Sequence, residues 1–135
     1  MIDKRQLRHG NLIALNLVNG TTIAIVDQIK NRGIVWEVDG VNGYAHFKDI
    51  LPVELSPEWL NKFSFNKWAN GAYHKEAMRT WRVWYDAYEK AAAYCTDVYP
   101  ELGHAIHLPI RIEFVHQLQN VYFMMTEEEL TIKEP

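Results

Sequence analysis

The residues of this chain best able to do chemistry stand together near its C-terminus, in the block His116-Gln117-Leu118-Gln119-Asn120. The block places four neutral polar side chains in little more than one helical turn. This is unusual, because helices usually carry Glu and Lys on their solvent-exposed face. Two interpretations stay open. The side chains form either a network that bonds the backbone edge of an adjacent sheet, or a face that recognises a partner. Catalysis is the least favoured interpretation.

Aromatic side chains are the second group of candidate binding residues. The chain contains five Trp and seven Tyr, more than a core of this size requires. Interfaces favour both residue types, because each buries a large area at low entropic cost. Trp36 and Tyr44 lie on predicted strands close to turns and join the candidate binding residues. The alternative is that they are ordinary core residues.

The sequence contains no recognisable catalytic motif. His104 and His107 are three residues apart, but the further ligands that zinc requires are missing, so we interpret them as loop histidines. Cys95 lacks an activating neighbour and reads as a small buried residue. Carboxylates are numerous without forming an acid–base motif, and there is no phosphate-binding loop. We therefore expect no enzyme, no metal and no cofactor.

Composition limits the classes of partner and compartment. With 135 residues, of which 48% are hydrophobic, the chain is long enough to bury a core of its own. A net charge of −3 argues against extensive non-specific binding to nucleic acid, although Lys4, Arg5 and Arg8 form one basic cluster. No apolar run approaches the roughly 20 residues of a membrane span, and the first residues do not resemble a signal peptide. We expect a cytoplasmic protein that makes no membrane contact.

Residues 1–55 are predicted to form a β-meander. The run Leu12–Val18 leads through Asn19-Gly20 into a second β-rich run. Two such runs joined by Asn-Gly are the strongest short-range hairpin signal, with positive φ at both turn residues. A further turn is expected at Asp39–Gly43. Four or five short strands in so few residues favour a small, strongly bent barrel of the SH3 type.

A short helix is predicted for residues 56–65. Ser56 is a natural N-cap, and Pro57 takes the first helical position, where its missing N–H costs nothing. Residues 66–113 are expected to be mainly β, with strands over Thr80–Tyr85 and Leu108–Glu113. Residues 87–95 fit either a helix or a returning strand.

A C-terminal helix is predicted for residues 114–130, packed on the sheet. Its apolar residues recur every three to four positions, from Ile112 to Met125, as expected for a helix with one buried side. No linker or internal repeat interrupts the chain. We therefore predict one α+β domain covering residues 1–135.

Three segments of the chain carry a family resemblance: Leu7–Leu12, Glu58–Phe65 and Phe114–Leu130. They resemble the patterns L-R-x-G-N-x, E-W-L-x-x-F-G-F and Y-V-H-Q-L-Q-N-L-Y-F-A-L-T-G-E-E-L of a family of short proteins from Bacteroides-type gut bacteria, their phages and mobile elements. The chain departs from these patterns where Ser64 and Glu127 replace glycine, and Glu127 is expected to let the closing helix run on. The resemblance implies a phage or mobile-element setting and no particular activity.

These observations lead to one favoured function and two alternatives. We expect a non-enzymatic protein-interaction or accessory module that binds an unknown protein partner or a second copy of itself. The first alternative is a nucleic-acid-binding accessory protein that uses the barrel together with Lys4, Arg5 and Arg8. The second alternative is a small hydrolase or metal enzyme.

Overall fold

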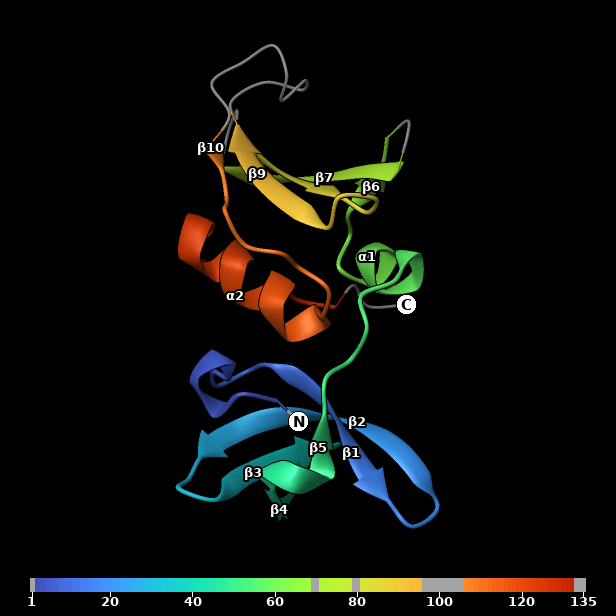
Figure 1. Ribbon diagram of the computed structural model, residues 1–135, viewed down its shortest axis with the longest axis vertical. Coiled ribbons are helices and arrows are strands. Elements are labelled where there is room, and N and C mark those ends of the chain that lie inside the picture. Colours follow the sequence, from blue (N-terminus) through green and yellow to red (C-terminus); the bar gives the residue numbers. More distant parts are fainter. Residues whose placement is uncertain (1, 69–70, 79–80, 96–105, 133–135) are drawn as a thin grey trace. The chain divides into compact units, whose positions relative to one another are not determined.

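The computed structural model describes residues 2–68, 71–78, 81–95 and 106–132. The chain divides into two compact units, Met1–Glu54 with Phe114–Asn120 (unit 1) and Leu55–Glu113 with Val121–Pro135 (unit 2). Each unit contains an antiparallel sheet, and helices complete both, so the predicted α+β class is confirmed (Figure 1). That residues 1–135 unfold as a single domain stays a prediction.

Unit 1 contains an open five-stranded sheet with the strand order β4-β3-β2-β1-β5. The expected closure into a barrel is therefore wrong, because β4 and β5 are the two edges of the sheet. The last strand pairs with β1 at only two positions, and Pro52, which has no N–H to donate, follows it directly. The elements are η1 (Lys4–Gln6), β1 (Leu12–Leu17), β2 (Gly20–Ile29), β3 (Gly33–Val38), β4 (Val41–His46), η2 (Phe47–Asp49) and β5 (Ile50–Leu51).

The hairpin predicted between β1 and β2 is confirmed, but the geometry predicted for its turn is wrong. Leu17 pairs with Gly20, which makes Val18 and Asn19 the turn residues. Of Val18, Asn19 and Gly20, only Gly20 has a positive φ, 121°. The positive φ that the turn needs is thus supplied by the glycine after the turn, and Asn19 does not adopt it.

The turn between β3 and β4 has the geometry that was expected between β1 and β2. Val38 pairs with Val41 across it. Asp39 and Gly40 both have positive φ, 50° and 81°, as a type I′ turn requires. Asp-Gly suits this geometry because Asp tolerates left-handed backbone better than most residues and Gly adopts it at no steric cost. The strand that follows begins at Val41, earlier than the predicted turn allowed.

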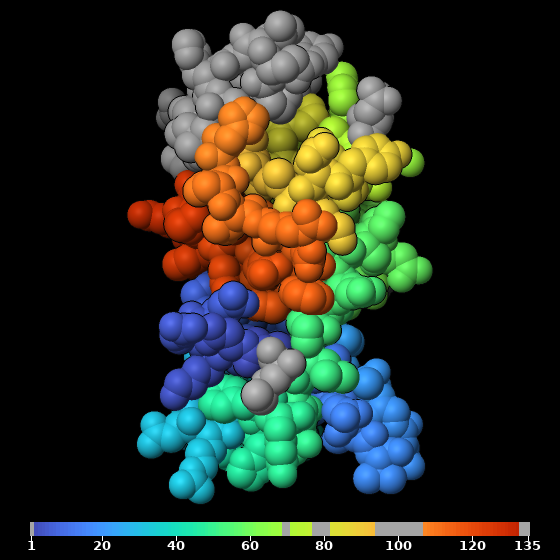
Figure 2. All heavy atoms as spheres, in the orientation of Figure 1, coloured from blue at the N-terminus to red at the C-terminus, as the bar shows by residue number. Residues whose placement is uncertain are grey.

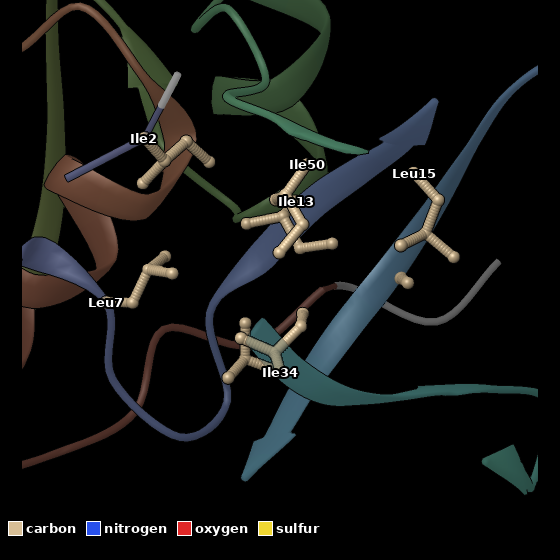
Figure 3. Close-up of a cluster of buried hydrophobic side chains, with 8 residues drawn as sticks. Ile2, Leu7, Ile13, Leu15, Ile34 and Ile50 are labelled. Atoms are coloured by element: carbon tan, nitrogen blue, oxygen red, sulfur yellow. The ribbon is translucent and has the colours of Figure 1, made fainter. Parts of the chain in front are cut away.

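The core of unit 1 is aliphatic and lies on one face of this sheet. Trp36, Val38, Ala45 and Phe47 pack at its margin. Figure 3 shows part of the cluster, to which the N-terminal segment contributes as well as the strands. Because strand side chains alternate between faces, Ile13 and Leu15 of β1 enter the core together, as do Ala24 and Val26 of β2. Its buried members are Ile2, Leu7, Ile13, Leu15, Ala24, Val26, Ile34 and Ile50.

Helix α1 (Pro57–Lys62) begins as predicted, although it is shorter than expected. The Ser56 hydroxyl accepts a hydrogen bond from the Trp59 N–H at 3.4 Å. The helix ends at Phe63, and Ser64 then takes a left-handed φ of 67°. The predicted N-cap and the proline at the first helical position are thus confirmed.

Replacing Ser56 with alanine should lower the free energy of unfolding by about 1 kcal/mol, because a helix N–H loses its acceptor. Ser56→Asn should retain most of the stability, since Asn is an equally good N-cap. Urea unfolding curves of the two variants measure the difference. Equal midpoints for Ser56→Ala and the parent protein would contradict the assignment of the cap.

Unit 2 contains a second open antiparallel sheet, with the strand order β10-β9-β8-β7-β6. Its strands confirm the mainly β prediction and decide between the two interpretations of residues 87–95, because a turn at 87–90 precedes the returning strand β9. The strand predicted at Leu108–Glu113 is wrong. Pro109, without an N–H, interrupts that segment. The strands are β6 (Asn66–Lys67), β7 (Ala72–Met78), β8 (Trp81–Asp86), β9 (Ala91–Cys95) and β10 (Ile106–His107).

A buried tyrosine holds the segment before the last helix in unit 2. Tyr85 is 4% exposed, and its hydroxyl donates a hydrogen bond of 2.7 Å to the Ile112 carbonyl. Desolvation, aided by the charge of Asp86, raises the pKa of Tyr85 to about 12. The backbone N–H of Ile112 donates to the Lys90 carbonyl. Both backbone groups of Ile112 are therefore satisfied without a strand.

Helix α2 (Val115–Thr126) ends earlier than predicted. Glu127 takes a left-handed φ of 59° and donates its N–H to the Phe123 carbonyl. The Thr126 hydroxyl donates to the Tyr122 carbonyl and accepts from the Glu128 N–H. The expectation that Glu127 lets the helix run on to residue 130 is therefore wrong, because the stop is made by local hydrogen bonds that do not require glycine.

Replacing Glu127 with glycine should raise the free energy of unfolding by about 1 kcal/mol, because left-handed backbone strains every residue that carries a Cβ. Glu128→Gly removes the same charge at a position without positive φ and should instead destabilise the protein through the added chain entropy. Thermal melts of both variants test this. A lower melting temperature for Glu127→Gly than for the parent protein would contradict the expected strain.

Candidate functional site

Gln119 lies at the centre of the polar block and is buried in unit 1, with 2% of its surface exposed. Its side-chain oxygen accepts the Leu12 N–H, at the start of β1, at 2.8 Å. Its amide nitrogen donates to the Gly10 carbonyl at 3.1 Å. One side chain of α2 thus satisfies both a donor and an acceptor of the backbone that leads into β1.

Asn120 joins the same backbone segment through further bonds. Its amide nitrogen donates to the Gln6 carbonyl at 2.6 Å. Its side-chain oxygen accepts from Asn11 Nδ2 at 2.8 Å and from Arg8 Nε at 3.2 Å. Asn11 is fully buried and accepts the Arg8 N–H with its own side-chain oxygen at 2.7 Å. Asn120 and Asn11 therefore link the helix to the loop between η1 and β1.

His116 is buried and held in its neutral form. It is 1% exposed, and desolvation lowers its pKa to about 4. Its Nε2 lies 3.5 Å from Gln6 Oε1, its Nδ1 has no hydrogen-bond partner in the described part of the chain, and its ring stacks on that of Phe114 at 6.0 Å. Chemically, it is an uncharged imidazole shielded from water.

Gln117 has a local role at the start of the helix. Its side-chain oxygen accepts the Phe114 N–H at 3.0 Å, one of the backbone groups that the first turn of a helix leaves unsatisfied. The side chain is half-buried. A Gln three residues into a helix makes this bond in a capping box.

The contacts of the block support the network interpretation. Gln119 and Asn120 bond backbone groups of Gln6, Gly10 and Leu12. Of these only Leu12 belongs to the sheet, whereas the interpretation placed the bonds on the edge of the sheet. Gln119 and His116 are too deeply buried to form an exposed surface. The sequence pattern could not identify the partners, because residues 6–12 precede the helix by more than 100 positions.

Trp36 and Tyr44 are not brought together by the fold. Trp36 packs at the margin of the core of unit 1, where Gly43 opposes it, and a Cβ at Gly43 would come within 2.2 Å of the indole ring. Tyr44 pairs with Val35 and so lies on the opposite face of the sheet. Of these two candidate residues only Tyr44 is exposed, with half of its surface accessible.

The predicted basic cluster at the N-terminus is divided among different contacts. Arg5 forms an ion pair with Asp3 at 2.8 Å, and this carboxylate raises the pKa of Arg5 further. Arg8 is engaged with Asn120 and with the Gln119 carbonyl. Lys4 is exposed. These residues therefore do not form one basic patch.

A surface hollow of about 560 Å³ lies at the β2–β3 turn of unit 1. Its lining combines two cations with an aromatic ring and an amide, and Tyr44 is the only sequence-predicted binding residue in it. Figure 2 shows the cyan part of the chain, which includes the β2–β3 turn, at the surface. Lys30 and Arg32 were not among the binding residues predicted from the sequence. The lining residues are Ile29, Lys30, Asn31, Arg32 and Tyr44.

The remaining candidate residues do not add a second site. Within the described residues, no three His, Cys, Asp or Glu side chains come together as a possible metal site. His107 is exposed in β10, whereas His104 and the side chain of Cys95 lie outside the described residues. Among the helices in the described part of the chain, none is both long and apolar enough to cross a membrane.

Comparison with protein-family models, curated protein sequences and solved structures finds no significant match. The function is therefore argued from the geometry of the chain. The resemblance carried by Leu7–Leu12, Glu58–Phe65 and Phe114–Leu130 stays a prediction.

Proposed function

We propose that this chain is a non-enzymatic accessory module of a phage or mobile element, in which an SH3-like unit binds a protein partner. Two features support the SH3-like assignment. The strand order β4-β3-β2-β1-β5 is that of an SH3-like meander, with its last strand beside its first. The short helix η2 between β4 and β5 occupies the place where such folds make a tight turn.

The contacts within the chain support the proposed family. The opening segment Leu7–Leu12 and the closing segment meet through the bonds of Gln119 and Asn120. The two positions where the family pattern has glycine, Ser64 and Glu127, both have left-handed backbone, the conformation that glycine adopts most easily. The resembling residues thus have structural roles, and recognition is left to other surfaces.

An exposed apolar face on the sheet of unit 1 carries the proposal of protein binding. Of fourteen large hydrophobic side chains that are exposed in the described chain, eight lie between residues 17 and 51. Ala14 pairs with Ile23 on one side and with Leu51 on the other, so these three side chains form one row. Ile25 lies two residues further along the same face. We call Ile23, Ile25 and Leu51 the apolar face.

The exposure of these side chains suits a protein surface as partner. Ile23, Ile25 and Leu51 are 40%, 39% and 37% exposed. Covering aliphatic groups on one face with another apolar surface lowers the free energy, because it removes them from water. The first partner to test is a second copy of the chain, because identical sheet faces can pack about a two-fold axis.

Sedimentation velocity of the purified protein at increasing concentration tests this proposal. The parent protein should associate reversibly, and the double variant Ile23→Lys/Leu51→Lys should remain monomeric, because a lysine on each flanking strand interrupts the face. Both proteins should melt at similar temperatures, since exposed substitutions usually change stability by less than about 0.5 kcal/mol.

A matched control is Tyr88→Lys, which places a lysine at an exposed position of unit 2. This variant should associate as the parent protein does. A parent protein that stays monomeric at every concentration would argue against a second copy as the partner. Equal association of the parent protein and the double variant would contradict any role for the apolar face.

A further inference from the structure

We propose that the hollow lined by Lys30, Arg32 and Tyr44 binds single-stranded nucleic acid, with the two cations on phosphates and the tyrosine ring against a base. This site is separate from the apolar face. It also differs from the cluster of Lys4, Arg5 and Arg8, in which the two arginines are already engaged.

The two cations of the hollow are available to a ligand. Lys30 and Arg32 are exposed, and neither side chain forms an ion pair or hydrogen bond with another residue that the structure describes. Their backbone, in contrast, is held. The Lys30 N–H donates to the Gly33 carbonyl, and the Arg32 carbonyl accepts the Phe47 N–H. An ordered turn thus presents two positive charges, one of them the planar guanidinium that suits phosphate.

The tyrosine ring is placed beside this turn by a neighbouring glycine. A Cβ at Gly33 would come within 2.9 Å of the Tyr44 hydroxyl and within 2.0 Å of the Ala45 carbonyl oxygen. The absence of a side chain at Gly33 therefore lets Tyr44 reach the turn. The ring also meets His46 edge-on, with centroids 5.4 Å apart. Half of the tyrosine surface remains open to a ligand.

The composition of the hollow favours a nucleotide over a simple anion. The hollow is open to solvent over most of its extent, which suits contact with part of an extended chain more than enclosure of a small molecule. Ile29, whose side chain is exposed, also lines the hollow. A carboxylate-rich peptide would use the cations only. Phosphate contacts beside an aromatic platform are typical of single-strand recognition.

The proposal is tested by fluorescence anisotropy with a short labelled oligodeoxythymidine. Tyr44→Ala should weaken binding about five- to 150-fold at constant salt, the range that loss of one stacked base produces. Lys30→Ala and Arg32→Ala should each reduce the slope of log affinity against log salt by about 0.7, because each removes one phosphate contact. Thermal melts establish that the variants are folded.

Two controls separate this site from the rest of unit 1. Lys48→Ala removes an exposed cation of η2 that does not line the hollow, and it should leave affinity and salt slope unchanged. Adding Tyr44→Ala to the double variant Ile23→Lys/Leu51→Lys should still weaken oligonucleotide binding. The role of the hollow in binding nucleic acid can therefore be tested independently of the role of the apolar face in association.

Two results would overturn the proposal. The first is oligonucleotide binding that is absent, or that is unaffected by all three substitutions in the hollow. The second is an oligoglutamate peptide that binds at least as tightly as the oligonucleotide and loses affinity in the same variants. This second result would assign the hollow to acidic peptides.

Discussion

Gln119→Ala is expected to lower the free energy of unfolding by about 3 kcal/mol, the largest effect of any side-chain truncation in the polar block. The substitution leaves the Leu12 N–H and the Gly10 carbonyl without their partners. Each buried polar group left unsatisfied costs about 1–3 kcal/mol. A loss of this size corresponds to a fall in melting temperature of roughly 10 °C.

Asn120→Ala tests the same network from its second member. It removes the acceptor of Asn11 Nδ2 and the donor to the Gln6 carbonyl, so we expect a loss of about 1–3 kcal/mol. The matched control is Gln28→Ala, which truncates an exposed glutamine of β2 and should cost less than about 0.5 kcal/mol. If Gln119→Ala and Asn120→Ala both have the same melting temperature as Gln28→Ala, the hydrogen bonds of Gln119 and Asn120 do not stabilise the fold.

Stability should fall by about 3 kcal/mol between pH 6.5 and pH 4 because of His116 alone. Burial lowers its pKa from 6.5 to about 4 in the folded protein. Within this interval the unfolded chain binds a proton that the folded chain does not, so acid favours unfolding by about 1.4 kcal/mol per pH unit. Above pH 6.5 the imidazole is neutral in both states. Below pH 4 it is charged in both, and the effect levels off.

The contribution of His116 is isolated by comparison with His116→Gln, which cannot titrate. Other groups add to the total pH dependence, because the pKa values of Asp3, His74 and Glu113 are also lowered in the folded protein. Urea unfolding of both proteins across this pH range gives the difference in slope. NMR titration of the His116 ring should give a midpoint far below 6.5. A midpoint near 6.5 would show a solvated imidazole.

Features that depend on neighbouring residues could be predicted from the sequence. The Ser56 cap and the proline after it act within one helical turn, so residue type and spacing were sufficient. The first hairpin was likewise recognisable, because Asn-Gly joins two β-rich runs. The type of the turn could not be predicted in the same way, because a positive φ can be adopted by Asn19, by Gly20 or by both. In the structure only Gly20 adopts it.

Features that depend on distant residues were decided by the tertiary structure. The sequence by itself identified the polar block at Gln119 and Asn120, but their partners at residues 6–12 are fixed only when the helix meets the start of β1. The hollow likewise depends on contacts between residues that are distant in the sequence. Tyr44 comes next to Lys30 and Arg32 because β4 pairs with β3 and Gly33 leaves room for its ring. Local preferences determine which elements form, whereas side-chain contacts between them depend on register and packing, which no short window of sequence contains.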